Sequence, residues 1–103
     1  MKIIRSKDFT ASRAWGAIDI ANISGITTRL HWTNAPYKWH VNDGGEVLAV
    51  LNGNVEMRYR LNGEVLSTLL KAGDIFHATV GTEHVANPIG EPRILVVERE
   101  GSV

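Results

Sequence analysis

The sequence predicts a single all-β domain built as a small barrel or sandwich. Three features support this prediction: apolar and polar residues alternate with a period of two, glycines and prolines are scattered singly between short apolar runs, and no segment shows the apolar stripe of an amphipathic helix. A chain of 103 residues has the length of one domain. We expect about seven to nine short strands, because closing such a sheet removes its exposed edges.

The first predicted strand is Ile26–Trp32. Its apolar positions begin at Ile26, recur at every second residue and end at Trp32, whereas Arg29 and His31 lie on the opposite face. This is the period of a half-buried strand. Residues 11–17 are the only candidate for a helical turn, but their short length and the glycine within them fit a loop equally well.

The middle of the chain predicts two hairpins in tandem. Residues 47–51 are apolar on both faces, which is typical of a central strand, and they end at Asn52-Gly53. Residues 55–61 alternate, and Asn62-Gly63 then repeats the same dipeptide before a strand at 65–70. Asparagine and glycine both tolerate the positive φ of a type I′ turn, so we expect a tight turn at each dipeptide.

Two more strands complete the predicted sheet. Residues 71–74 form a turn before a short strand at 75–79. Residues 88–92 contain two prolines and a glycine, so we expect a loop there, followed by an apolar strand at 94–98.

Composition excludes several classes of function. Eleven Lys and Arg residues balance eleven Asp and Glu residues, which gives zero net charge and removes the long-range attraction of nucleic acid or an anionic membrane. The absence of cysteine excludes disulfides, thiolate metal sites and cysteine nucleophiles. The first residues lack the apolar run of a signal peptide, and no segment approaches the roughly 20 apolar residues of a membrane span. We therefore expect a cytoplasmic protein that binds neither nucleic acid nor membrane.

Polar residues that suit metal binding gather in two segments. In the first, His40 and Asn42 lie on one face of an extended strand, and the flexible Gly44-Gly45 pair permits a bend that returns Glu46 to that face. In the second, His84 follows a predicted strand and a glycine-containing turn. Histidine and carboxylate side chains are common metal ligands, so the question is whether the two segments meet.

The two segments resemble the paired motifs of the cupin superfamily. The first cupin motif has two histidines separated by one residue, a glutamate three or four residues later, and a glycine after six more. The matching positions are His40, Asn42, Glu46 and Gly53, with asparagine in place of the second histidine. The second motif is matched in register by Gly73, Gly81 and His84, whereas Thr79 replaces its proline and Asn87 comes one residue early.

This resemblance implies a double-stranded β-helix, or jelly-roll barrel. Residues 1–103 would form one domain, with residues 1–25 as an N-terminal strand or arm and residues 26–99 as the barrel core. A swapped strand, an interface arm and simple packing are all open for the first segment. Small cupins often pair as homodimers through their outer sheets, so the resemblance also implies a homodimer that buries an apolar outer strand.

The resemblance further implies a divalent metal ion inside the barrel. In cupins the ligands come from the histidines and glutamate of the first motif and the histidine of the second, which correspond here to His40, Asn42, Glu46 and His84. An amide oxygen is a weaker donor than imidazole for manganese, iron, nickel or zinc, so water is an alternative ligand at the Asn42 position. The sequence does not distinguish these four metals, and a metal-free cluster of hydrogen-bonded polar groups is the alternative.

Three further residues have both a functional and a structural interpretation. His77 is either a general acid or base in the barrel or a structural histidine. His31 and Arg29 either contact an anionic substrate or belong to a solvated outer face.

Two hypotheses of function follow. The first is a metal-dependent enzyme, oxygenase-like or isomerase-like, that acts on a small molecule. The second is a non-catalytic protein that binds or senses a sugar or a small acid, in which the incomplete ligand set no longer activates anything. They differ in whether the metal ion is obligatory.

Overall fold

The computed structural model describes residues 1–102 and confirms the all-β jelly-roll prediction. A short 3-10 turn, η1 (Ser6–Asp8), precedes seven strands. The strands are β1 (Gly16–Ile23), β2 (Ile26–Trp32), β3 (His40–Val41), β4 (Glu46–Leu61), β5 (Glu64–Lys71), β6 (Ile75–Ala78) and β7 (Glu83–Arg99). Within residues 1–102, no helix has the length and apolar character needed to span a membrane.

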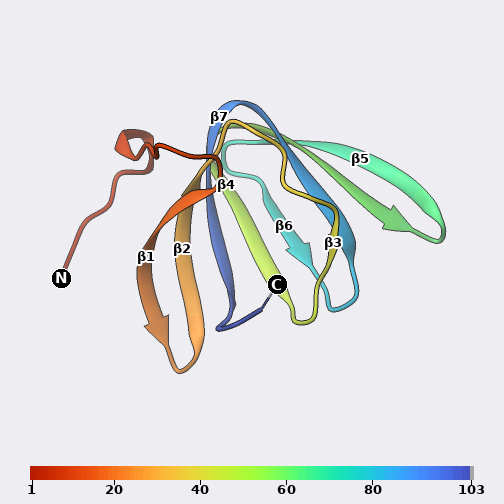
Figure 1. Ribbon diagram of the computed structural model, residues 1–103, viewed down its shortest axis with the longest axis horizontal. Helices are drawn as coiled ribbons and strands as arrows, with labels where there is room; N and C mark the ends of the chain where they lie inside the picture. Colours follow the sequence, from red (N-terminus) through yellow and green to blue (C-terminus); the bar gives the residue numbers. More distant parts are fainter. Residues whose placement is uncertain (103) are drawn as a thin grey trace.

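The two longest strands, β4 and β7, organise the fold. They run antiparallel to each other and bend together, so that each contributes to both layers of the barrel (Figure 1). The first half of β4 and the last half of β7 lie in a layer with the order β1-β2-β7-β4-β6. The other halves lie in a layer with the order β3-β7-β4-β5.

The predicted hairpin at Asn52-Gly53 is wrong. The dipeptide lies inside β4, where the pairing with β7 shifts register between Val50 and Asn54. Gly53 still adopts a positive φ of 75°, but the irregularity bends one continuous strand instead of reversing the chain. The prediction at Asn62-Gly63 is confirmed, because this dipeptide joins β4 to β5 with positive φ at both residues.

The predicted loop at residues 88–92 is also wrong. These residues belong to β7 and lie beside the bend of β4, where Pro88 is opposite Val55 and Ile89 is opposite Asn54. Gly90 has a positive φ of 76°. The prolines and glycine therefore accompany a bend in a strand, which their turn propensity alone does not distinguish from a loop.

The core lies between the two layers. It consists of aliphatic side chains from β4, β5 and β7: Leu48, Val50, Val55, Met57, Leu70, Ala86, Ile94 and Val96. Burial of each large aliphatic side chain contributes about 1.5–3 kcal/mol, which is the main source of stability in a chain without disulfides.

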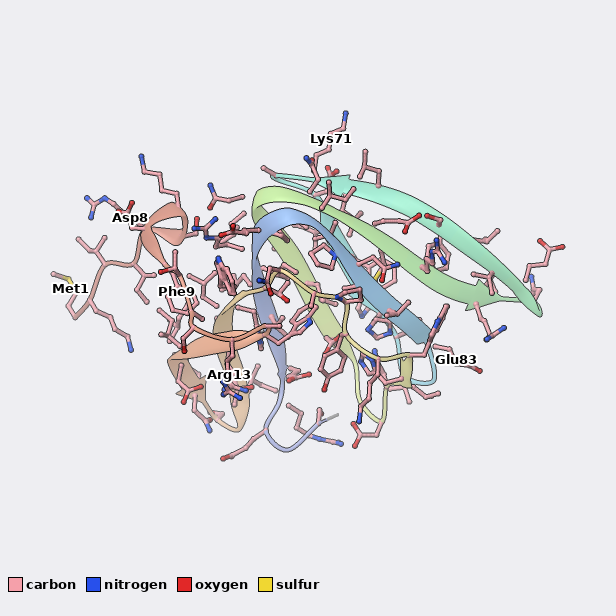
Figure 2. All side chains as sticks on the ribbon, turned by 45° about the horizontal axis from the view of Figure 1, so that its top comes forward. Met1, Asp8, Phe9, Arg13, Lys71 and Glu83 are labelled. Carbon is pink, nitrogen blue, oxygen red and sulfur yellow. The ribbon has the colours of Figure 1, made fainter. Side chains whose placement is uncertain are left out.

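The N-terminal segment packs on the outer face of the first layer. Arg93 lies opposite Trp32 in the β2–β7 register, and its Nε donates a hydrogen bond to the Phe9 carbonyl at 2.8 Å. Figure 2 shows the chain from Met1 to Arg13 running along this side of the molecule. No helical turn forms at residues 11–17. Instead β1 begins at Gly16 and pairs with β2 of the same chain.

Candidate metal centre

Three of the predicted ligands come together at one end of the barrel. One ligand atom each from His40, Glu46 and His84 lies within 4.8 Å of the other two. His84 is 1% exposed and Glu46 is 9% exposed, so this is an interior cluster that bulk water solvates poorly. Buried histidine and carboxylate groups need hydrogen-bond partners or a cation, and this set can hold a divalent metal ion.

Strand register explains this convergence. His40 is directly opposite His84 in the short β3–β7 ladder, and their ring centroids are 4.2 Å apart. Residues 42–45 lead the chain from β3 to β4, and Glu46 is the first residue of β4. There it is paired with Glu98 of β7, so a second carboxylate joins the cluster.

Both candidate histidine ligands have their Nδ1 atoms occupied by the backbone. Nδ1 of His40 lies 3.3 Å from the Lys38 carbonyl oxygen, and Nδ1 of His84 lies 3.3 Å from the Thr82 carbonyl oxygen. A carbonyl oxygen only accepts, so Nδ1 carries the proton in both rings and Nε2 is the ligand atom. Nε2 of His84 faces the Glu46 Oε1 at 3.2 Å. Two lone pairs cannot face each other at this distance without a cation between them, either a proton or a metal ion.

The two paired glutamates divide one proton between them. Burial, together with the hydrogen bond and the negative charge of Glu46, raises the pKa of Glu98 to about 8. Burial also opposes the ionisation of Glu46, but hydrogen bonds from His84 and Glu98 outweigh it and lower the Glu46 pKa. At neutral pH Glu98 is therefore a neutral hydrogen-bond donor, and Glu46 is the carboxylate available to a metal ion.

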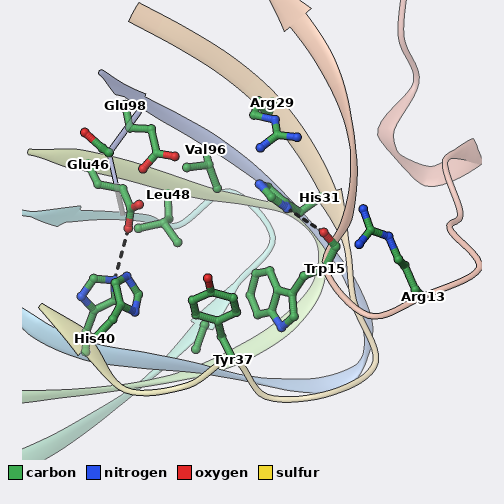
Figure 3. A pocket seen from close by; sticks show the side chains of 13 residues that line it. Arg13, Trp15, Arg29, His31, Tyr37, His40, Glu46, Leu48, Val96 and Glu98 are labelled. Atoms are coloured by element: carbon green, nitrogen blue, oxygen red, sulfur yellow. Dashed lines mark hydrogen bonds and ion pairs between the residues drawn. The ribbon is translucent and has the colours of Figure 1, made fainter. Parts of the chain in front are cut away.

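The cluster forms one end of a pocket of about 300 Å³ (Figure 3). Leu48, Val96 and Ala86 line the apolar middle, and Trp15 and Tyr37 form an aromatic wall whose ring centroids are 5.4 Å apart. A volume of this size suits a small organic molecule. Both Arg29 and His31 line the pocket, so their side of β2 is not the outer face of the barrel, although the Arg29 side chain is still 43% exposed.

The structure does not bring Asn42 or His77 into this pocket. Asn42 is buried, but its Nδ2 donates to the Ala78 carbonyl at 3.0 Å and its side chain is not part of the pocket wall. A ligand role for Asn42 stays a prediction. His77 is exposed on β6 and also lies outside the pocket, because the alternation of the strand turns its neighbours Phe76 and Ala78 inward.

Sequence reasoning missed several residues of the pocket wall. Glu98 could have been found from the alternation of its strand, because Ile94, Val96 and Glu98 occupy alternate positions and share a face. Arg13, Trp15 and Tyr37 could not, because they lie in irregular segments where no periodicity assigns a face. Trp15 adopts an unusual positive φ of 60°, a strained conformation for a bulky residue, immediately before β1.

Comparison with known proteins gives matches only at the level of structure. No family model and no curated protein matches the sequence. A cupin-2 domain protein from Shewanella frigidimarina superposes with a TM-score of 0.80 at 23% identity, covering 95% of both chains.

Two solved enzymes are also similar. Hydroquinone 1,2-dioxygenase PnpCD, in complex with Cd²⁺ and 4-hydroxybenzonitrile, gives a TM-score of 0.74 at 13% identity over 93% of this chain and 69% of that one. Fe(II)-HppE with the alternative substrate (S)-1-HPP gives 0.62 at 17% identity over 72% of this chain and 42% of that one. The chain has the cupin fold. The strand order, the bent β4–β7 pair and these superpositions all support this assignment.

Proposed function

We propose that the protein is a metal-dependent enzyme that binds one divalent metal ion through His40, Glu46 and His84 and acts on a small molecule in the adjoining pocket. The observation that carries this proposal is the orientation of the two histidine rings, which places their ligand atoms beside the Glu46 carboxylate. The backbone contacts of both Nδ1 atoms leave Nε2 of each ring as the ligand atom, and Nε2 of His84 already lies 3.2 Å from the Glu46 carboxylate. Two histidines and one carboxylate also leave coordination positions open to a substrate.

A bound ion of this kind supplies Lewis-acid or oxygen-activating chemistry. The chain itself supplies the surroundings. Glu98 lines the pocket beside Glu46, and in the metal-free protein it holds a proton because its pKa is raised to about 8, so it is a candidate to give a proton to a substrate oxygen. Trp15 and Tyr37 bind and orient the apolar part of a small molecule and exclude water from that side of the pocket.

The similar structures support this proposal without fixing the reaction. One is described with Cd²⁺ and another with Fe(II), and one is a dioxygenase. The same fold supports many unrelated activities, so neither the substrate nor the reaction of those proteins transfers to this chain. Manganese, iron, nickel and zinc all remain compatible with the ligand set.

The test is metal analysis of protein purified without chelator, before and after reconstitution. We expect a near-stoichiometric transition metal in the wild type and in His77→Ala, and a large loss in His84→Ala and Glu46→Gln. His77→Ala is the matched control, because it removes an exposed histidine that lies outside the pocket. Undiminished metal in His84→Ala, or a wild type that stays empty after reconstitution, would falsify the assignment.

A second measurement separates an enzyme from a binding protein. Ligand binding that raises the melting temperature equally with and without metal favours the non-catalytic alternative, because the ion is then dispensable. A shift that is clearly larger when the metal is bound favours the proposed enzyme, because part of the ligand then contacts the ion.

A further inference from the structure

The end of the pocket opposite the candidate metal centre is positively charged. Figure 3 shows His40 and Glu46 on one side of the pocket and Arg13, Arg29 and His31 on the other. Leu48 and Val96, with the aromatic wall, lie between the two ends. The pocket is therefore polar at both ends and apolar in the middle. The end with Glu46 favours a bound cation, and the end with the arginines favours a bound anion.

At this end of the pocket, one of the two guanidinium groups has an ion-pair partner among the described residues and the other has none. Nε of Arg29 donates to the Asp19 carboxylate at 2.7 Å, so one of the two guanidinium groups is already paired. Arg13 forms no ion pair with any other residue in the range 1–102. Burial, reinforced by the nearby charge of Arg29, lowers the pKa of His31, so its ring is neutral at neutral pH.

His31 is held in a defined orientation at this end. Its Nδ1 lies 3.4 Å from the Trp15 carbonyl oxygen, which can only accept, so the proton is on Nδ1 and Nε2 carries a lone pair. The ring also packs edge-on against Trp15, with centroids 5.8 Å apart. His31 thus contributes an oriented acceptor beside the guanidinium groups and adds no positive charge to the two arginines.

We propose that the substrate is a small organic monoanion with an apolar or aromatic body, whose carboxylate binds between Arg13 and Arg29 while its other end faces His40, Glu46 and His84. This inference rests on the proposed function for the role of the metal centre and names the class of substrate. Guanidinium groups match the planar carboxylate with paired hydrogen bonds. One guanidinium group left unpaired by residues 1–102 fits a carboxylate monoanion better than a phosphate dianion, and a cavity of about 300 Å³ admits only a small molecule.

The test uses metal-free protein, so that it does not depend on the metal centre. Benzoate, its uncharged isostere benzamide, and phenyl phosphate are titrated by calorimetry at low ionic strength. We expect benzoate to bind at least about tenfold more tightly than benzamide, a difference of about 1.4 kcal/mol, and at least as tightly as phenyl phosphate. The preference should fall as salt is added, because part of the site is exposed to solvent.

Two variants and one control locate the site. Arg29→Met and Arg13→Met should each abolish most of the preference for benzoate over benzamide. Arg58→Met should keep it, because Arg58 is an exposed residue paired with Glu56 outside the pocket. Equal binding of benzoate and benzamide, retention of the preference in Arg29→Met, or tighter binding of phenyl phosphate than benzoate each overturns the proposal.

Metal analysis of the same variants separates this inference from the proposed function. Arg29→Met should retain its metal, because Arg29 is not among the candidate ligands. Selective benzoate binding by a protein that never takes up metal refutes the metal centre and leaves the anion site standing. Full metal occupancy without selectivity for the carboxylate refutes the anion site and leaves the metal centre standing.

Discussion

Glu98 makes the stability of the metal-free protein depend on pH in an unusual direction. In the folded protein its pKa is raised to about 8, whereas an unfolded glutamate titrates near 4.5. Between these values the unfolded state has lost the proton and the folded state retains it, so rising pH favours unfolding. Most paired carboxylates act in the opposite sense. The free energy of unfolding should therefore fall as pH rises towards 8 and level off above it.

The magnitude can be worked for the interval from pH 6.5 to pH 9. The Glu98 pKa lies about 1.5 units above the lower limit, which corresponds to about 2 kcal/mol at 1.36 kcal/mol per unit. Glu98 is only half-buried, and solvent screening reduces this value to about 1 kcal/mol. For a domain of this size, that amounts to a melting temperature about 4–8 °C lower at pH 9 than at pH 6.5.

The assay is thermal unfolding of chelator-treated, desalted protein across this interval. Glu98→Gln should remove the fall, because its amide still donates a hydrogen bond to Glu46 and has no proton to lose. His40, whose pKa is lowered by burial, is present in both proteins, so its contribution cancels in the comparison. Glu91→Gln changes an exposed glutamate of β7 and should behave like wild type. A wild-type profile that is flat, or identical to that of Glu98→Gln, refutes the reasoning.

Two further predictions concern the backbone and the outer surface. Gly53→Ala should cost clearly more stability in urea than Gly63→Ala: both glycines have positive φ, worth roughly 1–2 kcal/mol, but only at Gly53 would the new Cβ approach the Pro92 Cα, at 3.0 Å. Equal losses would contradict a packed role for Gly53. We also expect a homodimer that buries the outer face of edge strand β5, where Val65 and Leu69 are 49% and 48% exposed. Replacing both with lysine should give a monomer in light scattering, and a monomeric wild type at micromolar concentration would rule this interface out.

The strands could be predicted where side-chain alternation is set by one buried face. Ile26–Trp32 has the same limits in the sequence and in the structure: Leu30 and Trp32 are buried on one face of β2, and Arg29 and His31 line the pocket on the other. Local turn chemistry was less informative. Asn52-Gly53 and Asn62-Gly63 share one dipeptide, yet the first bends a strand and the second forms a hairpin. The difference comes from pairing with β7 on both sides of the first dipeptide, a distant contact that no local window contains.

The candidate site divides in the same way. His40, Glu46 and His84 could be predicted because they have motif spacing. Asn42 was expected on the face of His40, but β3 ends at Val41. The Asn42 backbone then bonds to the loop before β7, accepting from the Gly81 N–H and donating to the Thr82 carbonyl, and alternation no longer applies.

Each end of the pocket holds charged groups that the described residues do not fully neutralise. At one end, Glu46 and Glu98 are opposite each other on β4 and β7, and two ionised carboxylates there would repel, so a proton or a metal ion must lie among them. At the other end, the Asp19 carboxylate pairs with Arg29, and Arg13 has no ion-pair partner within residues 1–102. Zero net charge for the whole chain conceals this separation. A metal cation at the first end and an organic anion at the second would balance both, so each proposed ligand corrects a local charge imbalance that the fold itself creates.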